Sequence, residues 1–130
     1  MPAVRVVVFD DDELFLTLFT RIFKSKNFQV KTYANPSLYF CMHSQTDSCP
    51  VDAPCTDFLL TDHMMPGMTG IEFLEKTRRM RCKIPDERKA IISANLTEEE
   101  YEKAKRLIPH VFHKSEAKEQ IALWVAGFSV

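Results

Sequence analysis

The chain has 130 residues, of which 45% are hydrophobic and 27% are charged, and its formal net charge at pH 7 is −1. These values are ordinary for one globular domain, and the lack of a basic excess argues against a nucleic-acid-binding protein. No apolar run is long enough to cross a bilayer, and the N-terminal residues lack the apolar segment of a signal peptide. We therefore expect a single cytoplasmic domain over residues 1–130.

The chain begins with a β-branched run at residues 4–9 that ends in three carboxylates, Asp10, Asp11 and Asp12. Such a run is typical of a buried strand in a parallel sheet. Adjacent carboxylates can bind Mg²⁺, or they can begin a solvated helix. A helix is predicted next, with its apolar face formed by Leu14, Phe15, Leu18, Ile22 and Phe23. Residues 28–33 then alternate apolar and polar side chains, as in a second strand.

Residues 35–56 are harder to assign. Asn35-Pro36-Ser37 predicts the start of a helix that continues to about residues 41–43, and residues 43–56 have the Ser, Asp, Pro and Cys content of a loop. The cysteines Cys41, Cys49, Cys55 and Cys82 fit no zinc template, although a metal quartet of Cys41, His43, Cys49 and Cys55, or a disulfide, stays open. In a reducing cytosol we expect free thiols.

The second half repeats a strand–helix pattern three times. A strand at 57–62 ends in Asp62, a strand at 90–94 contains Ser93, and a strand at 111–114 ends in Lys114. Capping boxes open the first two helices, and their residues are Thr69 with Glu72, and Thr97 with Glu100. The buried faces of the last two helices are predicted to contain Tyr101, Ala104, Leu107, Ile108, Ile121, Trp124, Val125 and Phe128.

Five alternations of strand and helix predict an α/β domain with a doubly wound parallel sheet. In the flavodoxin-like (βα)5 arrangement the strand order is 2-1-3-4-5, helices cover both faces, and ligands bind at the carboxyl ends of the strands. Asp10 and Asp11 there can bind Mg²⁺, and Asp62 can act as a carboxylate nucleophile that forms an acyl phosphate. Ser93 can donate a hydrogen bond to a phosphoryl oxygen, and Lys114 can offset the negative charge.

With these residues in place, the sequence resembles the receiver domain of bacterial two-component response regulators over essentially its whole length. The matching motifs are Asp10-Asp11 after a Val-rich strand, Asp62-x-x-Met65-Pro66-x-Met68-x-Gly70, Ser93-Ala94 after the fourth strand, and Lys114 after the fifth. The resemblance implies a phosphoprotein of phosphorelay signal transduction and not an enzyme in the usual sense, because such a domain catalyses only its own phosphorylation and dephosphorylation.

The resemblance also implies roles for individual residues. Asp62 would accept a phosphoryl group from a histidine kinase or a phosphotransfer protein. Mg²⁺ would be bound by Asp11, Asp62 and the backbone carbonyl of Met64, with Asp10 assisting through water. Ser93 would turn inward, and with Lys114 it would contact the phosphoryl group.

Further implications concern rates and partners. Positions Met64 and Asn95 would influence how fast the aspartyl phosphate is hydrolysed. The domain would regulate a downstream partner without itself binding nucleic acid or a membrane. A homodimer through the helix at 97–108, the strand at 111–114 and the last helix is one option.

Three features depart from the family pattern. Ser115 replaces the proline that usually follows the lysine, so we predict a trans peptide bond and an altered loop. Val111 replaces the switch aromatic, and Phe112 should not substitute for it because neighbouring strand residues point to opposite faces. The segment from about residue 41 to 57 is also longer than usual.

Two other functions remain open at the level of sequence. A small haloacid-dehalogenase-like phosphatase would use Asp10 as nucleophile and Asp12 as acid/base, although Glu13-Leu14 stands where that family has Gly-Thr. A receiver-like docking module that works without phosphorylation is the other alternative, and Val111 and Ser115 favour it.

Overall fold

The computed structural model describes residues 3–43 and 47–127. Its five strands, all parallel, are β1 (Arg5–Phe9), β2 (Gln29–Tyr33), β3 (Phe58–Asp62), β4 (Lys89–Ser93) and β5 (His110–His113). They form one sheet in the order β2-β1-β3-β4-β5, which confirms the predicted strand order. The four α-helices are α1 (Glu13–Lys24), α2 (Gly70–Arg79), α3 (Glu98–Leu107) and α4 (Ala117–Ala126).

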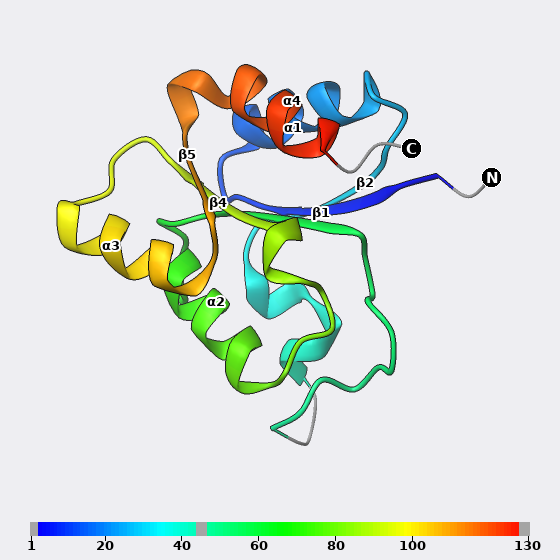
Figure 1. The fold of residues 1–130 in the computed structure, drawn as a ribbon, viewed down its shortest axis with the longest axis vertical. Coiled ribbons are helices and arrows are strands. Elements are labelled where there is room, and N and C mark those ends of the chain that lie inside the picture. The colour runs from blue at the N-terminus through cyan, green and yellow to red at the C-terminus, as the bar shows by residue number, and fades with distance from the viewer. Residues whose placement is uncertain (1–2, 44–46, 128–130) are drawn as a thin grey trace.

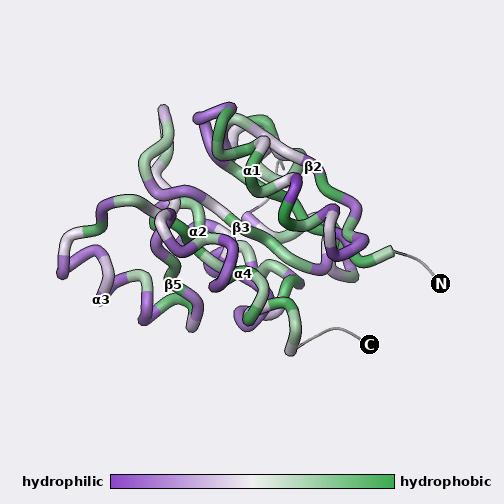
Figure 2. Tube along the Cα trace, turned by 90° about the horizontal axis from the view of Figure 1, so that it is seen from above, coloured by the Kyte–Doolittle hydropathy of each residue, from purple (hydrophilic) through white to green (hydrophobic). Residues whose placement is uncertain are grey.

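The helices cover both faces of the sheet (Figure 1). Side chains alternate along each strand, so Val6 and Val8 pack against α1 and α4, whereas Val7 and Phe9 pack on the other face with α2. Figure 2 shows hydrophobic residues concentrated in the interior strands, while α3 on the flank is largely hydrophilic. The chain therefore has two cores separated by one sheet, as a doubly wound fold requires.

The apolar face of α1 differs from the predicted one. Phe19, Ile22 and Phe23 are buried, but Leu14 is 81% exposed and Leu18 is 40% exposed. The helix begins after Asp12, whose side chain accepts a hydrogen bond from the Leu14 amide at 2.9 Å. This cap fixes where the helix starts, and Phe15 and Leu16 lie partly buried against the core beside the three buried residues.

The helix predicted from Asn35 to residues 41–43 is wrong. Two 3-10 turns, Pro36–Leu38 and Phe40–His43, occupy this segment, with Tyr39 extended between them (ψ 141°). Tyr39 is buried, and its ring packs at 5.3 Å from Phe9 and 5.2 Å from Tyr33. These tertiary contacts override the local preference for a continuous helix.

The remaining boundaries largely follow the predictions. Both capping boxes form, with the hydroxyls of Thr69 and Thr97 accepting from the amides of Glu72 and Glu100. Tyr101 is 43% exposed and so is not a core residue, and Phe128 lies outside the described residues. Ile121, Trp124 and Val125 are buried as predicted. None of the helices in the described part of the chain combines the length and hydrophobicity that a membrane span requires.

Candidate functional site

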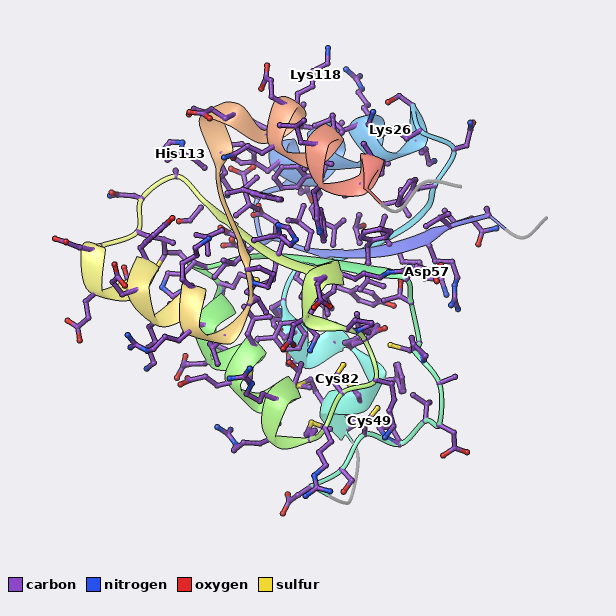
Figure 3. The ribbon with its side chains drawn as sticks, in the orientation of Figure 1. Lys26, Cys49, Asp57, Cys82, His113 and Lys118 are labelled. Atoms are coloured by element: carbon purple, nitrogen blue, oxygen red, sulfur yellow. The ribbon has the colours of Figure 1, made fainter. Side chains whose placement is uncertain are left out.

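The parallel register brings the polar strand ends to one edge of the sheet. Phe9 lies opposite Thr61, Asp62 opposite Ile92, and Ser93 opposite His113. Asp10 and Lys114 follow immediately after β1 and β5. Figure 3 labels His113 at this edge and Asp57 at the opposite edge, just before β3. The sheet topology therefore gathers the residues predicted from four separate segments.

Three carboxylates form the acidic part of the site. Asp10 is fully buried and Asp62 is 5% exposed, whereas Asp11 is exposed. One oxygen from each of the three lies within 4.8 Å of the others, and this is the only such group of potential metal ligands among residues 3–43 and 47–127. Asp10 Oδ2 is buried without a hydrogen bond of acceptable geometry. Hard oxygen donors with free lone pairs suit Mg²⁺, so the predicted donor set fits this ion.

Lys114 offsets part of the negative charge of the two buried carboxylates. Its Nζ lies 3.0 Å from Asp10 Oδ2 and 3.3 Å from Asp62 Oδ1. The contact with Asp10 is close for an ion pair, yet its geometry is not that of a hydrogen bond, so we regard the attraction as electrostatic. The ammonium also sits 4.0 Å from the centroid of the Phe15 ring. A cation over an aromatic face is favourable, so Phe15 contributes to holding Lys114 over the acidic pair.

The electrostatics of the site act mainly on Asp62. Burial, followed by the negative charge of Asp10, raises the pKa of Asp62 to about 6. Lys114 opposes this increase, and so does the backbone amide of His63, which donates to Asp62 Oδ1 at 2.8 Å. A cation added beside Asp10 and Asp62 would favour the ionised carboxylate, which is the form that can act as a nucleophile.

The turn after β3 is held by Gly70. Its amide donates to the His63 carbonyl at 2.8 Å, and a Cβ atom there would lie 2.2 Å from the carbonyl oxygen of Asp62. Gly67, in the same turn, has a φ of +81°, which glycine adopts without strain. The Met-Pro-x-Met-x-Gly segment thus lets the first turn of α2 approach the backbone of Asp62.

Ser93 lies in the site but does not contact Asp62 directly. Its side chain is buried, and its hydroxyl accepts a hydrogen bond from the Asn95 amide at 3.1 Å. In the part of the chain that the structure describes, the hydroxyl makes no hydrogen bond to Asp62 or Lys114. Met64 is 66% exposed and Asn95 is also exposed, so both side chains are accessible to solvent beside the site.

Two of the predictions made for the region around β5 are confirmed, namely the trans peptide bond and the opposite faces of Val111 and Phe112. No cis peptide bond occurs among the described residues, so the bond from Lys114 to Ser115 is trans as predicted. A 3-10 turn (Lys114–Glu116) follows the strand, and His113 Nδ1 accepts from the Ser115 amide at 3.1 Å. Phe112 packs on the α4 side, 5.6 Å from Trp124, while Val111 packs in the opposite core. Phe112 therefore does not replace the missing aromatic at Val111.

Other candidate residues lie outside the site. Asp12 is the exposed N-cap of α1, and this position does not suit the acid/base role that a phosphatase would require. All four cysteines are free thiols as expected, and the metal quartet left open for three of them with His43 does not form among the described residues, where His43 Nε2 contacts the Ser37 carbonyl oxygen at 2.6 Å. The four cysteines instead line one small cavity together with Tyr39, whose hydroxyl lies 2.8 Å from Cys55 Sγ.

Two long-range contacts at the site were not expected from the sequence. One is the position of Phe15 beneath Lys114. The other joins the buried imidazole of His63, 3% exposed, to Glu100 of α3, with 2.7 Å between Nε2 and Oε2. Neither pair has a local sequence signal, since His63 and Glu100 are 37 residues apart.

Comparison with known proteins decides the family. The family model described as "Response regulator receiver domain" matches residues 6–122. This chain belongs to the response regulator receiver domain family. No curated protein matches this receiver domain closely enough to identify a sequence relative.

Solved structures share the fold of this receiver domain. The receiver domain of the Francisella response regulator 1452 is 20% identical, with a TM-score of 0.69 and coverage of 97% of this chain and 99% of the other. The Vibrio cholerae chemotaxis protein CheY4 is 17% identical, with a TM-score of 0.70 and coverage of 97% and 98%. A CheY-like receiver domain from Methylobacillus flagellatus is 11% identical, with a TM-score of 0.74 and coverage of 98% and 100%.

Proposed function

We propose that this receiver domain accepts a phosphoryl group from a histidine kinase or a phosphotransfer protein onto Asp62, and that the modification changes its conformation to regulate a partner or an output domain. The observation that carries this proposal is the position of Lys114, whose ammonium lies within 3.3 Å of both buried carboxylates, Asp10 and Asp62. A carboxylate nucleophile, a fixed cation and an acidic cation-binding group are the components that phosphoryl transfer to Asp requires.

The reaction is a transfer between two covalent carriers. An Asp62 carboxylate oxygen attacks phosphorus, the bond from phosphorus to the donor imidazole nitrogen breaks, and that nitrogen keeps the electron pair. Asp10, Asp11, Asp62 and the Met64 carbonyl would hold Mg²⁺, which supplies charge neutralisation for the phosphoryl oxygens when bound. Lys114 would contact the oxygens of the product aspartyl phosphate, and Ser93 would donate a hydrogen bond to them once the segment after β4 moves toward β3.

In this function the domain itself is the acceptor of the phosphoryl group, and its role is signalling. It would catalyse only its own phosphorylation and dephosphorylation, and the exposed Met64 and Asn95 are the positions proposed to influence how fast water removes the phosphoryl group. A DNA-binding response regulator of the LuxR family from Staphylococcus aureus, 18% identical with a TM-score of 0.70, shares this fold. For the present chain we propose a cytoplasmic location, a kinase or phosphotransfer partner, and an output that other residues or another protein provide.

Acetyl phosphate with Mg²⁺ tests the proposal without the cognate kinase. Intact-mass spectrometry should show the addition of one phosphoryl group to the wild type, no addition when Mg²⁺ is chelated, and no addition to Asp62→Asn. The matched control is Asp57→Asn, because Asp57 precedes β3 at the opposite edge of the sheet and pairs with Arg5. Modification of Asp62→Asn to the wild-type extent would overturn the proposal.

A docking module that acts without phosphorylation is the second candidate, and Val111 is the observation that favours it. The side chain at this position is aliphatic and packs in the α2–α3 core. Beryllofluoride with Mg²⁺, a non-covalent mimic of the phosphoryl group, separates the two candidates. NMR shift changes in β4, β5 and the segment between β4 and α3 support a phosphorylation switch. Changes confined to the residues that contact Asp62 support the docking module.

A further inference from the structure

His63 forms a direct link between the phosphoacceptor strand and α3. It follows Asp62 in sequence, and its backbone amide donates to Asp62 Oδ1, while its side chain points to Glu100 in α3. The imidazole Nε2 lies 2.7 Å from Glu100 Oε2. Because the carboxylate is an acceptor, Nε2 carries the hydrogen in this contact.

Glu100 is fixed in place by a second interaction. Its other oxygen, Oε1, accepts from the Thr97 amide at 2.9 Å, and the Thr97 hydroxyl accepts from the Glu100 amide at 3.1 Å. The first turn of α3 and the end of β3 are therefore joined through one carboxylate. Since α3 begins at Glu98, only residues 94–97 separate Ser93 from this joined turn.

Stability alone gives a poor account of His63. Its Nδ1 is buried and has no hydrogen-bond partner within the part of the chain that the structure describes. An unsatisfied buried polar atom is destabilising, and an apolar side chain of similar size would avoid it. A buried residue that departs from this rule next to a reactive group suggests a role in function.

We propose that His63 and Glu100 are a positioning pair that holds the segment from Ser93 to α3 in its unphosphorylated arrangement. This inference rests on the proposed function. In the present arrangement the Ser93 hydroxyl accepts from the Asn95 amide and makes no contact with Asp62. Closing Ser93 onto a phosphoryl group requires the segment to move toward β3, and the His63–Glu100 contact resists that movement.

The pair therefore sets how readily the domain adopts the phosphoryl-binding arrangement. A ligand that favours a minor arrangement binds with an apparent affinity reduced by the small population of that arrangement. Breaking the contact should raise that population. Affinity for a phosphoryl mimic should then increase even where the folded state becomes less stable, which is the opposite of what a purely structural defect would do.

The test compares beryllofluoride affinity at saturating Mg²⁺ in the wild type and in His63→Leu, which removes the imidazole and leaves the capping box intact. We expect His63→Leu to bind beryllofluoride about fivefold more tightly. Glu100→Gln keeps the acceptor for the Thr97 amide and should bind more tightly than the wild type. In the His63→Leu background, Glu100→Gln should add nothing, since the two residues act as one unit.

Two controls separate this effect from general loosening of α3. Glu75→Gln breaks an exposed ion pair between α2 and α3, in which Lys103 Nζ lies 3.5 Å from the Glu75 carboxylate, and it should leave the affinity unchanged. Thr97→Val removes the helix cap but not the His63 contact, and it should lower thermal stability without tightening beryllofluoride binding.

The outcomes distinguish the two proposals. Equal or weaker binding by His63→Leu, with normal binding by the wild type, overturns the positioning pair and leaves the phosphoacceptor function intact. A wild type that binds no beryllofluoride overturns both. Amide hydrogen exchange in metal-free protein gives a readout without ligand, because residues 94–100 should exchange faster in His63→Leu, and unchanged exchange there also overturns the pair.

Discussion

The ammonium of Lys114 lies 3.3 Å from Asp62 Oδ1, although Lys114 follows β5 and Asp62 ends β3, and β4 separates these two strands in the sheet. Both side chains are largely buried, with exposed fractions of 10% and 6%. The attraction between buried charges is screened less than the attraction between charges on the surface, and removing one partner leaves an uncompensated buried charge. Lys114 is therefore the cation that opposes the effects of burial and of Asp10 on the pKa of Asp62.

Replacement of Lys114 by Met should therefore disable Asp62. The alkyl chain remains and the cation is lost, so the pKa of Asp62 should rise further above about 6 and fewer molecules should carry the nucleophilic carboxylate at neutral pH. We expect phosphorylation by acetyl phosphate at pH 7 to slow by about 10- to 100-fold. Initial rates from intact-mass spectrometry check this, with Lys118→Met as the control because Lys118 is exposed on α4 and points away from the site (Figure 3). Equal rates in Lys114→Met and the wild type would contradict the role of the lysine.

The pH dependence of stability follows from the same carboxylate. The pKa of Asp62 in the folded, metal-free domain is raised from 3.8 to about 6. A raised carboxylate pKa means that the folded state binds the proton more tightly than the unfolded state. The resulting contribution to the free energy of unfolding is fully present below pH 3.8 and is lost as the pH rises through 6. From this group alone, the free energy of unfolding should fall by about 1–3 kcal/mol between pH 4 and pH 7.

Urea denaturation with a metal chelator, in the wild type and Asp62→Asn, isolates this contribution. The free energy of unfolding of Asp62→Asn should exceed that of the wild type by an amount that grows with pH. Excess Mg²⁺ should restore the stability of the wild type, because the ion binds only the folded site. A difference that does not change with pH would show that Asp62 titrates normally. Asp10→Asn should lower the pKa of Asp62, since the charge of Asp10 contributes to its increase.

Gly70 is predicted to be intolerant of a methyl group. A Cβ there would lie 2.2 Å from the Asp62 carbonyl oxygen, which is backbone and cannot rotate away. Gly70→Ala should therefore cost at least about 2 kcal/mol in the free energy of unfolding and displace the loop that follows Asp62. Gly127→Ala is the matched control, because its Cβ would meet its nearest neighbour at 3.8 Å and should change stability by less than about 0.5 kcal/mol. Similar denaturation midpoints for the two variants would contradict this account.

The thiols of the cysteine cluster should react slowly with alkylating reagents in the folded protein. Burial raises the pKa of Cys41 to about 12, and burial also raises the pKa of Cys55. Alkylation needs the thiolate, so iodoacetamide at pH 8 should modify Cys41 at least about tenfold more slowly in native protein than in urea. Peptide mapping of timed samples measures this. Rapid native modification of Cys41 would indicate that the cavity opens in solution.

The sequence was sufficient for the fold and for most of the site because both depend on local patterns. Each buried strand has its own apolar run, and the parallel topology then brings Asp10, Asp62, Ser93 and Lys114 to one edge without further information. Predictions were wrong where tertiary contacts compete with local preference. Tyr39 leaves the helical conformation to join an aromatic cluster, and that cluster could not be seen in the spacing of its neighbours.

The two contacts between residues far apart in the sequence could not be predicted for a related reason. Phe15 fits the apolar face of α1 equally well as an ordinary core residue, and only the position of Lys114 shows that its ring faces a cation. His63 appears in the sequence as part of a turn. Its partner Glu100 is satisfied locally by its capping box, so neither residue indicates the contact between them.

The central claim is that Asp62, and not another carboxylate of the acidic group, becomes an acyl phosphate. Borohydride reduces an acyl phosphate to an alcohol, so treatment after incubation with acetyl phosphate and Mg²⁺ converts a phosphorylated Asp to homoserine at that position. Peptide mapping should find homoserine at position 62 alone. Homoserine at position 10 or 11, or none in fully folded protein, would contradict the account.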